Sequence, residues 1–154
     1  MKSVITIIGW VTLSLAVPSF AHEGHGLPGS LPPPIHPGGK IKEAEHKGTH
    51  QAGKEEKELF FEVDYKDNAL KIHPLTLMPP NTTSWVKLSP KTDISNVGVK
   101  IENPRTKKTE AMKPTIGDEF IETPYDLRGS NRFIVYLTAT HDNELKEARV
   151  QIEK

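Results

Sequence analysis

The feature that most constrains this chain is a period of two in its apolar residues, which begins at Leu59 and continues to the C-terminus. The clearest run, NRFIVYLTAT at 131–140, carries apolar side chains on both faces. A strand with two apolar faces is buried on both sides, so we expect it in the centre of a sheet. Short alternating runs separated by Pro, Asn and Gly are typical of β-strands and hairpins. We therefore predict one all-β domain over residues 59–154.

Seven or eight short runs of this kind occur in the domain, and no segment has the pattern of an amphipathic helix. The runs cover residues 59–65, 69–77, 84–88, 97–101, 109–112, 119–122, 131–140 and 147–152. Their even spacing predicts a single antiparallel, immunoglobulin-like β-sandwich, with a small barrel as the alternative. Pro74 falls inside the second run, and because it has no N–H, we expect it at a sheet edge or a bulge.

The N-terminal residues have the three parts of a secretory signal. A positively charged start (1–3) precedes an uncharged, mostly apolar run (4–17), and Ala21 follows at a cleavage position. The apolar run is shorter than the ~20 residues that a membrane span needs. We expect residues 1–21 to be a cleaved signal peptide, which makes the protein periplasmic or secreted, with no stable membrane insertion after cleavage. Cleavage after Ala16 and an uncleaved anchor are the alternatives.

Residues 22–58 form a linker rich in Pro, Gly and charged residues, without an aromatic side chain. Such a segment buries too little apolar surface to offset the entropy of ordering, so we expect it to be disordered. It carries five of the seven histidines of the chain: His22, His25, His36, His46 and His50. Neutral imidazoles coordinate Cu, Zn and Ni well. The composition thus predicts capture of a divalent transition metal by these five residues, and a plain polar spacer is the alternative.

Several function classes are disfavoured by composition. The chain has no Cys, which excludes disulfides, thiolate ligands and thiol nucleophiles. Lys and Arg together number 20, as do Asp and Glu, and this balance gives no basic surface for nucleic acid. No arrangement of a nucleophile and a base is visible, so we expect that the protein is not an enzyme. We expect His73 to be an exposed strand residue. We expect His141 and Asp142 to form a polar turn.

The layout resembles a group of small bacterial periplasmic β-sandwich proteins of the YtkA-like and FixH-like type, and N-terminal regions of heavy-metal efflux adaptors. The residues that carry the resemblance are AHEGHG at 21–26 and the domain pattern that ends in FIVYLTAT and EARVQI. The mature N-terminal His22 is also similar to that of CopC-like copper carriers, although here more than thirty residues separate it from the domain. The resemblance implies a role in extracytoplasmic metal handling.

Two functions follow as expectations. The first is a periplasmic metal-binding protein, a buffer or carrier for Cu, Zn or Ni that serves an envelope efflux or maturation protein. The second is an accessory module of the cell envelope with no metal role, in which the sandwich docks on a larger protein.

Overall fold

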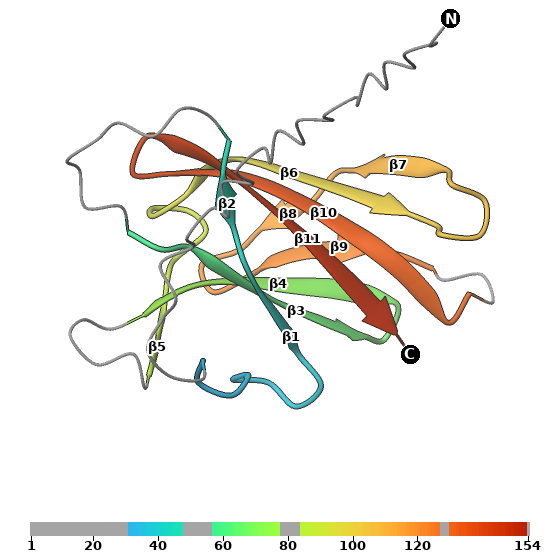
Figure 1. Ribbon diagram of the computed structural model, residues 1–154, viewed down its shortest axis with the longest axis horizontal. Helices are drawn as coiled ribbons and strands as arrows, with labels where there is room; N and C mark the ends of the chain where they lie inside the picture. Colours follow the sequence, from blue (N-terminus) through green and yellow to red (C-terminus); the bar gives the residue numbers. More distant parts are fainter. Residues whose placement is uncertain (1–30, 48–56, 78–83, 127–129, 154) are drawn as a thin grey trace, which may run out of the picture.

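The computed structural model describes residues 31–47, 57–77, 84–126 and 130–153 (Figure 1). These residues form two antiparallel sheets that pack face to face, and none of them lies in a helix. The prediction of an all-β sandwich is confirmed. Among the described residues, no helix has the length and apolarity needed to cross a membrane.

Six strands form the first sheet, called sheet A here, in the order β1-β3-β4-β9-β8, with β5 paired to β4. Their bounds are β1 (Lys40–Glu43), β3 (Phe60–Lys66), β4 (Ala69–Leu77), β5 (Trp85–Lys87), β8 (Thr115–Ile116) and β9 (Ile121–Pro124). Five strands form sheet B in the order β2-β11-β10-β6-β7. Their bounds are β2 (Glu45–His46), β6 (Ser95–Glu102), β7 (Thr109–Met112), β10 (Arg132–His141) and β11 (Glu144–Glu153).

The apolar side chains that face each other between the sheets make the main core. Phe61, Val63, Ile72 and Phe133 are at most 1% exposed, and the ring of Tyr65 packs on Phe133 with centroids 5.3 Å apart. As its two apolar faces predict, β10 lies between β11 and β6.

Two tight hairpins fix the register of the longest strand pairs. Asp67-Asn68 joins β3 to β4, and Asp142-Asn143 joins β10 to β11, and all four residues have φ between 50° and 67°. Positive φ at both central residues is the type I′ geometry that matches the twist of paired strands, and Asn and Asp tolerate it well. Because side chains alternate along a strand, this register decides which residues share each face of sheet A.

Pro74 lies within the sheet rather than at an outer edge. On one side β4 pairs with β3 from Ala69 to Leu75, and on the other β9 ends opposite Ile72 while β5 begins opposite Leu75. The carbonyl of Pro74 accepts a hydrogen bond from the N–H of Leu88, so Pro74 faces the β5 side. Its nitrogen therefore points into the gap between the two partner strands, where no ladder hydrogen bond is lost.

The expectation of disorder is wrong for residues 31–47 of the linker. β1 pairs with β3 at the edge of sheet A, and β2 pairs with β11 at the edge of sheet B. Between them Ala44 is buried, and its N–H donates to the carbonyl of Leu59. The physical reason is edge pairing: a segment with few apolar residues is ordered by backbone hydrogen bonds that the open sheet edges offer. Residues 22–30, 48–56 and the predicted signal peptide lie outside the described residues.

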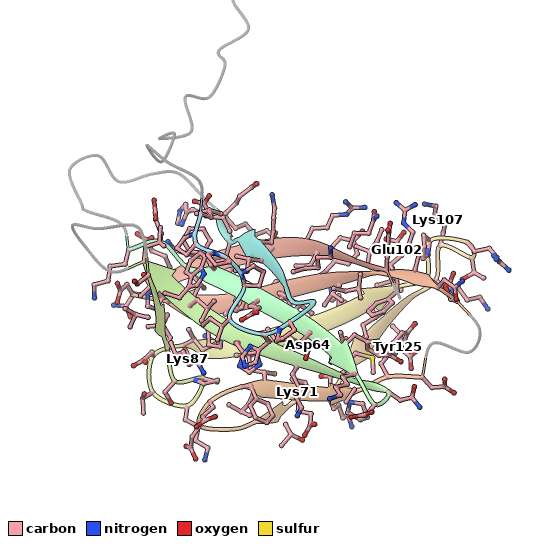
Figure 2. All side chains as sticks on the ribbon, turned by 90° about the horizontal axis from the view of Figure 1, so that it is seen from below. Asp64, Lys71, Lys87, Glu102, Lys107 and Tyr125 are labelled. Atoms are coloured by element: carbon pink, nitrogen blue, oxygen red, sulfur yellow. The ribbon has the colours of Figure 1, made fainter. Side chains whose placement is uncertain are left out.

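A second apolar cluster lies on the outer face of sheet A. Phe60, Leu75 and Leu77 are 0%, 0% and 7% exposed, and Ile41 and Trp85 pack against them. Residues 31–39, called the strap here, run across β3 and β4 on this face (Figure 2). The indole N–H of Trp85 donates to the carbonyl of Pro33 at 2.9 Å. Trp85 therefore anchors the strap instead of filling the main core.

Candidate metal-binding site

Two histidines meet where the strap crosses sheet A. Glu62 on β3 and His73 on β4 are direct cross-strand partners on the outer face, next to the pair Phe60 and Leu75. The strap places His36 on top of them, with the imidazole rings of His36 and His73 stacked at a centroid distance of 4.2 Å. Residues 37 apart in sequence are thus brought into one cluster of two imidazoles and a carboxylate.

Glu62 is fully buried, and in the described part of the chain its hydrogen bonds are with His36. Oε1 accepts the backbone N–H of His36 at 2.7 Å, and Oε2 lies 3.1 Å from His36 Nδ1. A buried carboxylate without partners is strongly unfavourable, so these bonds determine where residue 36 sits. Because an ionised carboxylate only accepts, Nδ1 of a neutral His36 carries the proton and Nε2 keeps its lone pair.

A tight turn brings the strap back into β1 after this contact. The N–H of Gly39 donates to the carbonyl of His36 at 3.0 Å, and Gly38 has φ of 83°. Pro37 and Gly38 thus take the two central positions of a type II turn, which requires a positive φ at its second central residue. A Cβ at Gly39 would overlap the carboxylate of Glu62, so the side chain of Glu62 approaches the backbone through the space that this glycine leaves.

His73 is almost fully buried. The ring of His36 is stacked on it, the ring of Phe120 lies at a centroid distance of 5.5 Å, and only 6% of His73 is exposed. Burial, together with the charge of a protonated His36, lowers the pKa of His73 below its usual value, although Glu62 acts in the opposite direction. His73 is therefore a neutral imidazole at neutral pH, which is the form that binds metals.

Each ring presents one ring nitrogen as an acceptor. Nε2 of His36 is the ring nitrogen that does not face Glu62. Nδ1 of His73 is buried and has no hydrogen-bond partner within the described part of the chain, and in the tautomer with the proton on Nε2 it carries a lone pair. Metal-binding histidines are characteristically oriented by an acceptor, as Glu62 orients the ring of His36.

The arrangement can offer an ion two imidazole nitrogens, His36 Nε2 and His73 Nδ1. In the ranges that the structure describes, no group of three or more His, Asp or Glu side chains is placed to hold an ion. Glu62 acts on the Nδ1 side of His36 and is a supporting acceptor. Because lone pairs lie in the ring plane, stacked rings share an ion only after one ring turns. The side chain of His36 is 32% exposed and lies on a loop, whereas His73 is on a paired strand, so we expect His36 to be the ring that turns, with loss of its Nδ1 contact to Glu62.

The other predicted histidines are distributed as follows. His46 is half-buried on β2, with Nδ1 3.7 Å from Oε2 of Glu144. It pairs with Lys146 in the ladder between β2 and β11, far from the strap in the fold. His22, His25 and His50 lie outside the described residues, so their predicted role as metal ligands stays a prediction. Of the two predicted ligands that the structure describes, His36 lies against a second histidine and His46 does not.

Sequence reasoning missed His73 and Glu62. His73 was expected to be an exposed strand residue, which is wrong because the strap covers it. One signal was present: the tripeptide Ile-His-Pro occurs twice, at 35–37 and 72–74, and its two histidines are the stacked pair.

His141 was expected in a polar turn but ends β10 and is 4% exposed, with Nδ1 2.9 Å from the carbonyl of Asp93.

A separate hollow of about 640 Å³ lies over sheet B and is lined by residues of β1, β2, β6, β7, β10 and β11. Its charged residues are of both signs, and they include Lys42, Lys100, Glu102 and Glu147. Tyr136 in this hollow donates to Oε2 of Glu102 at 2.6 Å, and Arg149 lies over its ring.

Comparison with known proteins adds no relative. No protein-family model matches the chain, and neither curated proteins nor solved structures gave a match.

Proposed function

We propose that this protein binds a transition-metal ion, Cu, Zn or Ni, outside the cytoplasm, as a buffer or carrier for an envelope efflux or maturation protein. The observation that carries the proposal is the stacked His36–His73 pair, in which Glu62 orients the ring of His36 and Nδ1 of His73 is buried without a hydrogen-bond partner among the described residues. Nitrogen ligands of this type suit all three metals.

The chemistry of the surroundings supports a cation site. The carboxylate of Glu62 lies within hydrogen-bond distance of His36 and is fully buried, where charge–charge interactions are less screened than in water. Depression of the His73 pKa keeps one ligand unprotonated, so a metal does not have to displace a proton from it near neutral pH. The predicted signal peptide and the histidines at 22, 25 and 50 agree with an exported metal-binding protein, and they stay predictions.

The test is a calorimetric titration of the exported, purified protein with Zn²⁺, Cu²⁺ and Ni²⁺ in turn. Mass analysis of its N-terminus establishes whether residues 1–21 are removed. The decisive variant is H36Q/H73Q, and the matched control is H46Q/H141Q, which removes two partly buried or buried histidines elsewhere. We expect the first variant to lose the tightest site and the control to keep it. Unchanged binding in H36Q/H73Q, or no binding by the unaltered protein, would contradict the proposal.

A further inference from the structure

The strap is joined to sheet A by few polar contacts, and most of them converge on one residue. Trp85 holds the carbonyl of Pro33, while His36 supplies both of the bonds to Glu62 and the stacking contact with His73. Trp85 also packs edge-on against the fully buried ring of Phe60, which belongs to the outer apolar cluster with Leu75. Opening the strap would therefore release the cover that Trp85 holds over this cluster, and it would leave Glu62 without the partners it has in the closed state.

The two proposed ligands belong to the two parts that would separate. His36 is on the strap, whereas His73 is on β4, paired on both sides in sheet A. An ion that both imidazoles bind is therefore a link between the strap and the sheet. The backbone N–H of His36 donates to Glu62 Oε1, and this bond does not involve the ring. It therefore keeps residue 36 in place while the ring turns to bind the ion.

We propose that a metal ion held by His36 and His73 clamps the strap over Phe60, Leu75 and Trp85, so that metal occupancy controls how often this face of sheet A opens. This inference rests on the proposed function and adds regulation of the same site. An ion that binds the closed form alone reduces opening by the factor 1 + [M]/Kd, which is about 100-fold at a free ion concentration of 100 times Kd.

Hydrogen exchange of the strap amides tests the clamp, with Zn²⁺ as the probe. The informative amides are those of His36 and Gly39, whose N–H groups donate to Glu62 and to the carbonyl of His36. At 100 times the Kd measured by calorimetry, we expect their exchange to slow about 100-fold, and exchange at the centre of β10 to change much less. In H36Q, Zn²⁺ is expected to leave the strap amides unchanged.

A Trp85→Phe variant keeps both proposed ligands but removes the indole bond to Pro33. We expect it to speed strap exchange without metal and to retain the slowing by Zn²⁺. If Zn²⁺ binds, with His36 and His73 required, yet the strap amides exchange as before, the clamp is refuted and the proposed function stands. Equal slowing of strap and β10 amides also refutes the clamp, since it reports general stabilisation. If Zn²⁺ does not bind at all, both proposals fail.

Discussion

His36 and His46 come from the same linker, and each lies beside a glutamate of the sandwich, yet their surroundings differ in one decisive way. The buried carboxylate of Glu62 lies 3.1 Å from Nδ1 of His36, and a second imidazole, that of His73, is stacked on His36 at 4.2 Å. Beside His46, Glu144 also lies 4.0 Å from the ammonium of Lys146, a side chain that is 5% exposed and donates to the carbonyl of Lys57.

The difference separates a ligand site from a structural contact. At Glu62 the carboxylate contacts an imidazole and no ammonium among the described residues, and Lys87 is the weakest of the charges that act on His73, which favours an added cation. At Glu144 a buried ammonium already neutralises the carboxylate, and a metal ion there would be repelled at short range. A count of histidines in the linker treats the two residues as equal, whereas the fold assigns them different roles.

The largest effect is expected from a double-mutant cycle on the pair. Each of H36Q and H73Q should weaken Zn²⁺ binding about 100-fold or more, because the two residues share one ion and the loss of even a supporting partner costs 10–100-fold. H36Q/H73Q should then be little weaker than either single variant, which is the signature of coupled residues. In the control cycle, H46Q, H141Q and H46Q/H141Q should each change the Zn²⁺ affinity less than about 3-fold, because both residues lie outside the proposed site. Calorimetry measures both cycles, and additive losses at 36 and 73 would refute a shared ion.

A smaller effect is expected when only the supporting charge is removed. Glu62→Gln keeps an acceptor oxygen for the N–H of His36 but removes the negative charge, so Zn²⁺ affinity should fall about 10-fold or more. The matched change, Glu144→Gln beside His46, should leave affinity unaltered. Equal losses in the two variants, measured by calorimetry, would mean that the protein responds to overall charge and not to this site.

The pH dependence of the free energy of unfolding, measured without metal, also distinguishes the site of His73 from the surroundings of His46. The pKa of His73 is lowered in the folded state, so the unfolded chain takes up the proton first as pH falls below about 6.5. The contribution of His73 to stability is thus complete above that pH and declines as pH falls toward its folded pKa. Urea unfolding at a series of pH values should show that the free energy of unfolding falls less at acid pH in H73Q than in the unaltered protein. The matched control is H46Q. An identical slope in H73Q would contradict the buried, neutral ring.

The smallest predicted change concerns the turn next to the site. Gly39→Ala places a methyl group where the Glu62 carboxylate now lies, so the carboxylate has to shift away from His36. We expect a loss of about 1 kcal/mol in the free energy of unfolding and a few-fold weaker Zn²⁺ binding. Gly38→Ala has open space but a φ of 83°, and should cost about the same stability through backbone strain while sparing affinity. If both variants bind Zn²⁺ equally, the position of Glu62 is not important for the ion.

The sandwich could be predicted from sequence because its determinants are local. The alternation of NRFIVYLTAT identifies the central strand β10, and Asp142-Asn143 marks its hairpin by residue types that accept positive φ. The short strands β1 and β2 could not be found in this way. KIKE and EH carry little apolar pattern, and they are strands because they meet open sheet edges.

The candidate site shows the same limit. His36 was among the predicted ligands because of its residue type, but its partner is set by the strap, which crosses the sheet through tertiary contacts with Trp85 and Glu62. Burial of Glu62 and His73 on the outer face depends on this cover, and a strand pattern alone predicts that such polar residues are exposed. Only the repeated Ile-His-Pro tripeptide linked the two histidines in the sequence.

Long-range ¹H–¹⁵N correlation of the histidine rings tests most directly whether His36 and His73 share one ion. With one equivalent of Zn²⁺ added to the exported protein, we expect metal-induced shifts at Nε2 of His36 and Nδ1 of His73, while His46 and His141 are unchanged. Shifts confined to His22, His25 and His50, with the His36 and His73 rings unaffected, would contradict it.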